Sequence, residues 1–495
     1  MIFLRRGKGR VIPAAVLALG ALLSGGEARA APSFTLEPGA ASVLAPAKVH
    51  HVERNPGAYR LFYSAAPDFI QSVTSADGGY TWTSEAGQRL SIQAGSPDAG
   101  GITAFGMTGK GADGFYKAYY VGISSTGLYS ILRATSTDQV AWVKTAGFNI
   151  RFGGGGAFVD SVHPFISGSS IQLYYIRDSA GGNTPANYRA YRMASADDGL
   201  TFSGETGVSG AVAYGLSVST LTSGVMRLYL ISPIGGGTAM QVLSFTGADG
   251  PVLSQESGVR FSTAAALSSI SVVKSTDGYR WLSFLTIPAP GTGTQHIYRA
   301  LTRDPSIDGI SPSMIYVHTV SGVSLATFTV SGEVFAPAVS SVTLRQGASA
   351  ATVTSCVRDS DLQLRIVADF LNSPPGWYSL TVTNPDGQSS TLANAVKLDY
   401  RPGAVALLDN LFRPLNGQTV KVTVNIPFSG NITARIYDLN GGRVRALYNG
   451  PAVMGDNNYA WDGKTDAGAV AASGLYLLRV KGPRVDAREK IVLIK

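Results

Sequence analysis

One short pattern returns five times in the first 306 residues of the chain. Each copy is a strand of bulky aromatic and aliphatic residues preceded by a glycine-bearing turn, and the copies begin 53 to 57 residues apart. They start at Tyr59, Tyr116, Ile171, Met226 and Tyr279. This period fits one four-stranded blade of a β-propeller, and closing five blades into a ring removes the exposed sheet edges that an open array would leave. The sequence therefore predicts a five-bladed β-propeller over residues 31–306.

A second turn motif follows the strand in each of the first three copies. It occupies residues 75–82, 136–142 and 195–202, is degraded at 247–250, and is barely visible at 302–304. The first copy matches the Asp-box pattern S-x-D-x-G-x-T-W at every fixed position. Serine and aspartate side chains accept backbone amide hydrogen bonds in such a turn, and glycine supplies a positive φ. We therefore predict that Asp77, Asp138 and Asp197 are structural.

With this blade rhythm and one complete Asp-box, residues 45–306 resemble the five-bladed propellers of the arabinanase, invertase and levansucrase type, and more loosely the sialidases. The resemblance implies a ligand site at the central mouth of the propeller and carbohydrate as the ligand class. It also implies, for a glycosidase, two carboxylates on the innermost strands of different blades, one held protonated and one ionised. A sialidase would instead need an arginine cluster and a tyrosine nucleophile.

The strand before each glycine turn is expected to be innermost, so five segments line the propeller axis. They are residues 47–53, 101–108, 158–166, 213–221 and 267–274. The candidate ionisable groups in them are His50, His51, Glu53, Asp160 and His163. The candidate catalytic residues are the two carboxylates, Asp160 and Glu53. The candidate ligand-binding residues are the three histidines and Tyr214, whose ring could stack on a sugar.

Several features weigh against catalysis and metal binding. His50 and His51 stand near the place where the resembled glycosidases carry their first acidic residue, and the third blade shows no clear glutamate. A metal held by Asp160 and His163 is disfavoured, because residues three apart on a strand point to opposite faces unless a bulge intervenes. We therefore predict no metal and no cofactor at the axis. The basic residues at one shared repeat position predict a stripe between sheets rather than a substrate clamp: Arg60, Lys117, Arg227 and Arg280.

Near residue 307 the repeat ends and a smaller module begins. Residues 307–400 resemble an IPT/TIG domain, a small immunoglobulin-like sandwich. The alternation of Tyr378, Leu380 and Val382 predicts a strand with one face in the core, and an Asn-Pro-Asp-Gly turn follows it. We expect the single cysteine, Cys356, to be a buried and inert thiol.

A third module closes the chain. Residues 401–495 resemble the FlgD-like immunoglobulin domain, through the W-D-G sequence at Trp461–Gly463 and the later G-x-Y at Gly474–Tyr476. We expect Asp462 and Asp466 to shape a glycine-rich turn, with a structural calcium ion as the open alternative. The position of the last strand at the chain end suggests sorting or anchoring.

The first 30 residues predict a cleaved signal peptide. A basic start, an apolar run from Val11 to Leu23 and the small-x-small site Ala28–Ala30 follow one another. Removal of this segment lowers the formal net charge from +8 to about +4. No later basic cluster interleaves with aromatics, and no later apolar run reaches 18 residues. We therefore expect no nucleic-acid binding and no transmembrane helix.

Together these patterns predict an exported, all-β protein with a five-bladed β-propeller followed by two immunoglobulin-like β-sandwich modules. The first functional hypothesis is an extracellular or cell-surface protein whose propeller recognises carbohydrate or a cell-surface polymer. The two modules would then act as spacer and anchor, with envelope or sorting machinery as a partner of the last one. Two alternatives stay open: a glycoside hydrolase that uses Asp160 and Glu53, and a structural or adhesive surface protein without enzymatic activity.

Overall fold

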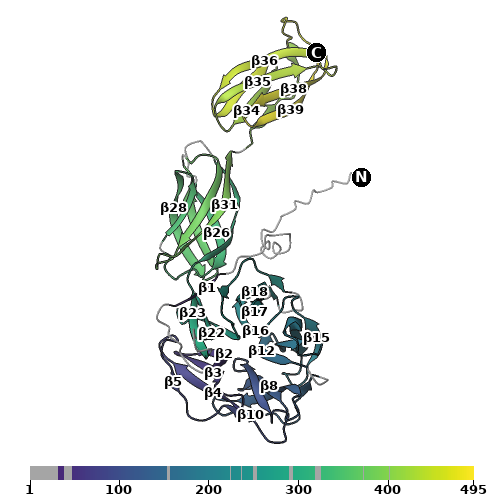
Figure 1. Ribbon diagram of the computed structural model, residues 1–495. Coiled ribbons are helices and arrows are strands. Elements are labelled where there is room, and N and C mark those ends of the chain that lie inside the picture. Colours follow the sequence, from purple (N-terminus) through teal and green to yellow (C-terminus); the bar gives the residue numbers. More distant parts are fainter. Residues whose placement is uncertain are drawn as a thin grey trace, which may run out of the picture.

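The computed structural model consists almost entirely of β-strands, and Figure 1 shows a propeller followed by two further modules in series. The described residues are 32–37, 47–152, 157–222, 225–235, 237–248, 253–288, 294–317, 325–339, 341–371, 373–400 and 402–495. The predicted signal peptide, residues 1–30, lies outside them. Within the described residues, no helix is long and apolar enough to cross a membrane. The predicted all-β class, a propeller followed by two sandwich modules, is confirmed.

Five antiparallel sheets stand around one axis, and we call them blades 1 to 5 (Figure 1). Blade 1 contains β2 (Lys48–Asn55), β3 (Ala58–Ser64), β4 (Phe69–Ser75), β5 (Thr83–Ser84) and β6 (Leu90–Ser91). Blade 2 contains β7 (Gly101–Met107), β8 (Tyr116–Ile123), β9 (Tyr129–Ser136), β10 (Val143–Lys144) and β11 (Ile150–Arg151). Blade 3 contains β12 (Val159–Ser167), β13 (Ser170–Asp178), β14 (Tyr188–Ser195) and β15 (Ser203–Gly207).

The last two blades follow the same order. Blade 4 contains β16 (Gly215–Thr222), β17 (Val225–Pro233), β18 (Met240–Ala248), β19 (Ser254–Gln255) and β20 (Phe261–Thr263). Blade 5 contains β21 (Ser269–Lys274), β22 (Trp281–Pro288), β23 (Gln295–Thr302) and, as its outermost strand, β1 (Phe34–Leu36). Because β1 pairs with β23, a strand from the beginning of the chain completes the last sheet and closes the ring.

The innermost strands of neighbouring blades lie side by side around the axis. Their small polar residues allow close approach and satisfy backbone groups across the gap. The Val52 amide donates to Ser271 Oγ at 2.9 Å, and the Val272 amide donates to Ser217 Oγ at 3.0 Å. Both serines are fully buried. Because a buried amide without an acceptor is costly, these hydroxyls stabilise the ring.

The repeated aromatic strand is the second strand of each blade, and it is buried on both faces. In β3, Leu61 packs towards blade 5 with Phe284, and its neighbour Phe62 packs towards blade 2 with Phe105. Side chains that alternate in direction therefore fill two different inter-blade cores. This explains why the repeated strand is nearly continuous in apolar residues. A full burial of one such side chain contributes about 1.5 to 3 kcal/mol.

The second module is a sandwich of strands that follows blade 5 directly. Its strands pair in the order β24 (Ser306–Ser311), β26 (Leu325–Glu333), β29 (Gln363–Asp369), β28 (Ser349–Ser360), β27 (Ser341–Gln346), β30 (Gly376–Thr383), β31 (Ser389–Tyr400) and β25 (Met314–Val317). Tyr378, Leu380 and Val382 face its core, as their alternation predicts. The expectation of a buried Cys356 is wrong: its side chain is exposed, and so are those of Ser355 and Val357 on either side of it in β28.

The third module consists of two sheets that pack around Trp461. One sheet contains β32 (Ala404–Leu408), β34 (Val420–Ile426) and β37 (Gly455–Trp461). The other contains β33 (Leu411–Phe412), β39 (Val485–Leu493), β38 (Gly474–Gly482), β35 (Gly430–Tyr437) and β36 (Arg443–Ala452). Asp462 accepts a hydrogen bond from the Lys464 amide, and Asp466 accepts one from the Ala446 amide at 2.8 Å. Asp462 therefore orders the turn after β37, and Asp466 ties the same segment to β36.

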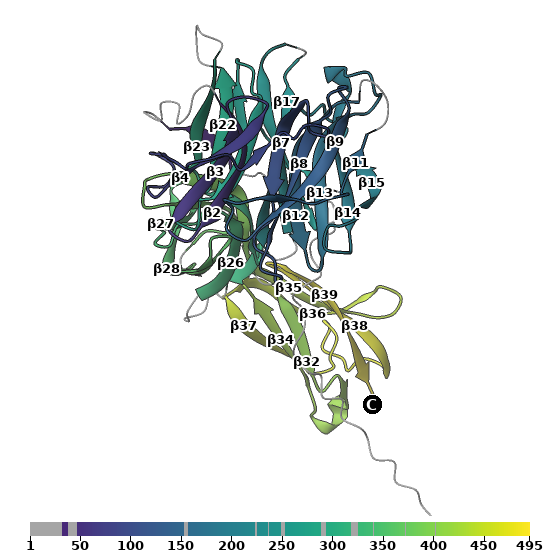
Figure 2. The same ribbon diagram turned by 90° about the horizontal axis from the view of Figure 1, so that it is seen from below.

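The second module meets the propeller at blades 4 and 5, and Figures 1 and 2 both show it against the propeller with the third module beyond it. At this junction the Arg227 guanidinium lies between two carboxylates, Glu256 of blade 4 and Glu333 of the second module. All three side chains are buried. The Trp281 indole of blade 5 also donates to Glu333, at 3.3 Å. One carboxylate of the second module thus binds two neighbouring blades.

Candidate functional site

A cavity of about 420 Å³ lies on the propeller axis, where the innermost strands of all five blades end. Apolar side chains such as Val218 and Val272 form part of its wall. Its polar lining groups come from all five blades: Glu53, Thr108, His163, Thr220 and Lys274. Concave sites with a few converging polar groups are the usual places for small-ligand binding.

Two histidines meet across the axis and form one side of this cavity. His51 comes from β2 of blade 1 and His163 from β12 of blade 3, and their ring centroids lie 5.3 Å apart. Each strand has a register shift near its histidine, between Val49 and His51 and between Asp160 and His163. The bulge in β12 is the exception that the sequence argument allowed, and it lets both Asp160 and His163 line spaces near the axis.

The protonation of His163 is set by its surroundings. Burial lowers the pKa of His163 well below its ordinary value, and the charge of His51 lowers it further. Two positive imidazoles at this distance would also repel each other. His51 Nε2 lies 3.3 Å from Glu53 Oε2, so the Glu53 carboxylate orients the His51 ring. The described residues contain no group of three or more His, Cys, Asp or Glu that could hold a metal ion.

The structure does not bring the two candidate catalytic carboxylates together. Glu53 lines the axial cavity, whereas Asp160 lies beyond the histidine pair and is bound to Lys48, with Nζ–Oδ2 at 3.0 Å. Lys48 and Glu53 are five residues apart on β2, which corresponds to roughly 15 Å along a strand. Glycosidase carboxylate pairs lie only about 5 to 10 Å apart. Asp160 and Glu53 therefore do not form such a pair.

The two remaining candidates do not line the axial cavity. His50 Nε2 lies 2.8 Å from Ser64 Oγ, next to the narrow space on the Asp160 side. Burial lowers the pKa of His50, and the charge of Lys48 adds to the effect. The Tyr214 ring packs edge-on against Tyr188 in the core beside blade 4. Tyr214 therefore offers no free ring face at the axis.

Several lining residues were missed by the sequence argument. Lys274 and Thr108 end two of the predicted axial segments and Thr220 lies one residue before the end of a third, but none of them is an acid, a histidine or an aromatic residue. The signal that could have found them is position, because each stands at the same end of an innermost strand. Lys274 Nζ lies 2.5 Å from Asp361 of the second module and 4.2 Å from the centre of the Trp281 ring.

The aspartates of the three turn motifs make local hydrogen bonds. Asp77 accepts hydrogen bonds from the Tyr80 and Thr81 amides and from the Thr81 and Ser75 hydroxyls. These bonds, above all those from Thr81, lower the pKa of Asp77 to about 2. Asp138 and Asp197 are bound in the same way by the amides of Ala141 and Thr201. None of the three lines the axial cavity.

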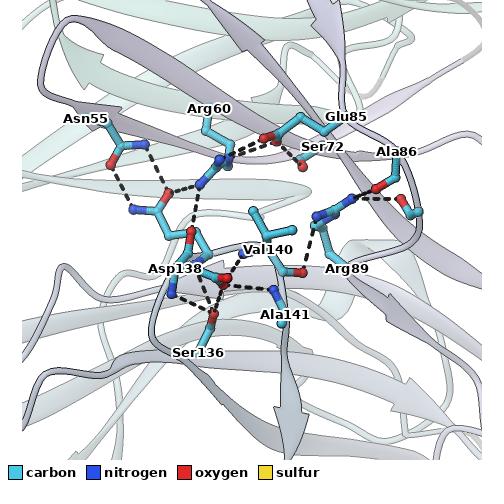
Figure 3. A network of polar contacts seen from close by, with 12 residues as sticks. Asn55, Arg60, Ser72, Glu85, Ala86, Arg89, Ser136, Asp138, Val140 and Ala141 are labelled. Atoms are coloured by element: carbon cyan, nitrogen blue, oxygen red, sulfur yellow. Dashed lines mark hydrogen bonds and ion pairs between the residues drawn. The ribbon is translucent and has the colours of Figure 1, made fainter.

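Figure 3 shows that the second of these turns is held by blade 1. Arg60 Nη1 donates to the Asp138 carbonyl at 3.1 Å, and Arg89 Nη1 donates to the Val140 carbonyl at 3.2 Å. Asn55 exchanges hydrogen bonds with the Gln139 side chain. The turn therefore locks two neighbouring blades together.

The stripe of basic residues is fully occupied by ion pairs. Arg60 pairs with Glu85, Lys117 with Asp113 and Asp198, Arg227 with Glu256 and Glu333, and Arg280 with Asp277. Because each cation already has a protein carboxylate, the stripe is not a substrate clamp.

Comparisons with known proteins separate the third module from the rest. The family model described as the FlgD Ig-like domain matches residues 412–484 and confirms the predicted resemblance over that range. No curated protein matches the chain.

Among solved structures, an endo-arabinase from Bacteroides thetaiotaomicron is 15% identical, with 56% of this chain and 97% of that chain covered and a TM-score of 0.41. A GH43_1 enzyme from Xanthomonas citri, complexed with xylose, is 13% identical, with 53% and 89% covered and a TM-score of 0.40. A family 117 glycoside hydrolase from Zobellia galactanivorans is 14% identical, with 56% and 88% covered and a TM-score of 0.37.

Proposed function

We propose that the propeller binds a glycan in its axial cavity without hydrolysing it. The observation that carries this proposal is the lining of the cavity: hydroxyl, imidazole and carboxylate groups converge from five blades, yet only one carboxylate is among them. Threonine hydroxyls donate and accept hydrogen bonds, and so does a neutral imidazole. Such groups match the hydroxyls of a sugar, and the valines of the wall match its apolar faces.

The same lining argues against the hydrolase alternative. Glycoside hydrolysis needs an acid and a second carboxylate on the two sides of the scissile bond. In the cavity, Glu53 is alone and is bound to His51. Asp160, which would have to be the partner, forms an ion pair with Lys48 outside the cavity. We therefore propose recognition as the function and place hydrolysis among the outcomes that would contradict it.

The proposal is tested with a glycan array, followed by calorimetric titration of the best ligand into the full chain. Glu53→Gln and Thr220→Val should each weaken binding by about tenfold, because each removes a hydrogen-bonding group of the cavity. Asp160→Asn is the matched control outside the cavity and should leave the affinity unchanged.

Two results would overturn the proposal. Reducing-sugar release that disappears in Asp160→Asn would support the hydrolase alternative. The absence of any glycan binding, together with retained attachment to cells, would support a structural or adhesive protein.

We further propose that the chain is exported and acts outside the cell or on its surface, with the third module as its anchor. The sequence of the first 30 residues supports export, and the FlgD Ig-like match supports a separate C-terminal module. Fractionation of cells that express the full chain, or a chain ending at residue 400, tests both points. Cytoplasmic retention of the full chain would contradict export, and equal surface retention of the two chains would contradict anchoring.

A further inference from the structure

A second cavity, of about 550 Å³, lies in blade 2 away from the axis. The loop at residues 93–98, the strands β8 and β9 and the hairpin at residues 144–151 surround it. Its charged lining residues are Asp98, Arg133, Lys144 and Arg151. Cations outnumber the single acid, so the charge of this cavity needs an explanation.

Asp98 cannot neutralise the excess positive charge of the cavity, because hydrogen-bond donors already surround its carboxylate. The carboxylate is fully buried and forms an ion pair with Lys144. Asp98 also accepts hydrogen bonds from the Tyr120 hydroxyl at 3.2 Å, from the Gln93 amide and from the Ser96 hydroxyl. Burial and the Asp98 charge raise the pKa of Tyr120, which keeps its hydroxyl a donor. Asp98 and Lys144 thus form a closed pair that adds no net charge.

Arg133 is the unusual member of this cavity. Its side chain is only 7% exposed, yet it forms no ion pair within the described part of the chain. Its Nη1 donates to Thr145 Oγ1 at 3.3 Å, and its buried Nε has no acceptor among the described residues. The neighbouring Tyr119 cannot be a counter-ion, because burial raises its pKa to about 12. A buried guanidinium without a negative partner is costly.

Other groups of the lining complete the chemistry. Asn149 Oδ1 is buried and accepts no hydrogen bond from the described residues, so it can accept one from a ligand hydroxyl. Arg151 is exposed and carries a second positive charge to the cavity. Phe148 and Leu132 supply apolar surface. The volume also falls within the range of small-ligand sites.

We propose that this cavity binds an acidic sugar, with its carboxylate on Arg133 and Arg151 and a ring hydroxyl on Asn149. The planar guanidinium fork matches a carboxylate in two hydrogen bonds, and a charge-assisted bond of this kind is about twice as strong as a neutral one. The ligand supplies the negative partner that Arg133 lacks in the protein. The site shares no lining residue with the axial cavity and does not depend on the function proposed for it.

The test is calorimetric titration of the full chain with galacturonate, glucuronate, galactose and inorganic sulfate. We expect the two uronates to bind, galactose not to bind, and sulfate to compete only weakly. Affinity should fall as salt rises, because the contact is electrostatic. Galactose binding as tightly as galacturonate, or sulfate binding as tightly as both uronates, would overturn the acidic-sugar assignment.

Variants locate the site. Arg133→Gln should weaken uronate binding by about tenfold or more, since it removes the buried charge. Arg192→Gln is the matched control, because Arg192 holds the same repeat position in blade 3 and lines neither cavity. Arg151→Gln tests the same site at an exposed residue whose substitution does not threaten folding. Uronate affinity that is unchanged in both Arg133→Gln and Arg151→Gln overturns the proposal, and loss in Glu53→Gln alone would place the ligand at the axis instead.

Discussion

Two junctions of the propeller contain an arginine at the same repeat position, and the two arginines bind different partners. Arg60 of blade 1 and Arg227 of blade 4 hold the same position in the repeated strand. Each forms a bidentate pair with a glutamate of its own blade, Arg60 with Glu85 and Arg227 with Glu256. Both glutamates begin the same local sequence, Glu-x-Gly-x-Arg. The spare Nη1 of Arg60 donates to the turn of blade 2 at the Asp138 carbonyl, as Figure 3 shows.

The spare Nη1 of Arg227 donates instead to Glu333 of the second module, at 2.8 Å. After β23 the chain does not form a full turn motif but enters β24, which pairs with the end of β26 where Glu333 lies. At this junction the second module therefore accepts the hydrogen bond from the arginine Nη1 that the aspartate turn of blade 2 accepts between blades 1 and 2. The comparison teaches that the second module packs against blades 4 and 5 through buried charge.

The two junctions also differ in burial, and this predicts the largest effect. Arg227→Gln removes the cation that lies between the buried Glu256 and Glu333 carboxylates, and we expect a loss of about 3 to 5 kcal/mol in the free energy of unfolding. Arg60→Gln removes the same residue from a partly exposed pair and should cost about 1 kcal/mol. Urea unfolding of both full-length variants measures the difference. Equal losses would show that the two junctions are energetically alike.

A second prediction concerns coupling between the second module and the propeller. Glu333→Ala removes the acceptor for Arg227 and for the Trp281 indole, and we expect a loss of about 2 kcal/mol. Scanning calorimetry should show one transition for the propeller and this module in the parent chain and two in the variant. Asp361→Ala, which breaks the partly exposed pair with Lys274 in the same interface, should cost less than about 1 kcal/mol and leave one transition. Two transitions in the parent chain would contradict the coupling.

Periodicity predicted the blades because every blade must bury the same strand between two neighbours. The aromatic repeat at β3, β8, β13, β17 and β22 is a direct consequence of that packing. Composition could not predict the exposed Cys356, because strand propensity does not say how far the sandwich core extends along a strand, and β28 is exposed on both faces at residues 354–357. The bulge at Ser161, with φ at 52°, is also a local event without a sequence signal of its own.

The candidate site was predicted only in part, for a physical reason. His51, Glu53 and His163 do line the axial cavity, because they lie on innermost strands. Asp160 is also near the axis but on the other side of the histidine pair. The depth of a side chain along the propeller axis depends on strand register and on bulges. An alignment of the sequence repeats alone does not predict either of them. The role of Glu333 depends on a contact between distant parts of the chain and had no local signal.

A third prediction tests how tightly a turn must fit against the preceding blade. Gly78 and Gly79 both have positive φ, at 83° and 90°. A Cβ on Gly79 would lie 2.8 Å from the Phe284 ring of blade 5, whereas one on Gly78 would meet nothing closer than 4.0 Å. Both alanine variants carry the left-handed strain, so Gly79→Ala should be about 1 kcal/mol less stable than Gly78→Ala. Thermal unfolding of the pair measures this, and equal melting temperatures would mean that the turn shifts freely.

The smallest predicted effect on stability comes from the charge of Asp77 in the first turn motif. The hydrogen bonds from Thr81 hold the pKa of Asp77 at about 2, below its ordinary value, so its ionised form stabilises the folded state. That contribution is fully present above about pH 4 and is lost as pH falls towards 2. Because the carboxylate is exposed, Asp77→Asn should cost less than about 1 kcal/mol at neutral pH.

The stability gap between the parent chain and Asp77→Asn should close as the solution is acidified through this window, in unfolding curves measured from pH 6 down to about pH 2. A gap that stays constant would mean that the shape of the turn, and not the charge of Asp77, holds blade 1 against blade 5. In that case the charge of Asp77 would contribute nothing to the junction between blades 5 and 1, whereas the junction at Arg227 depends on buried charge.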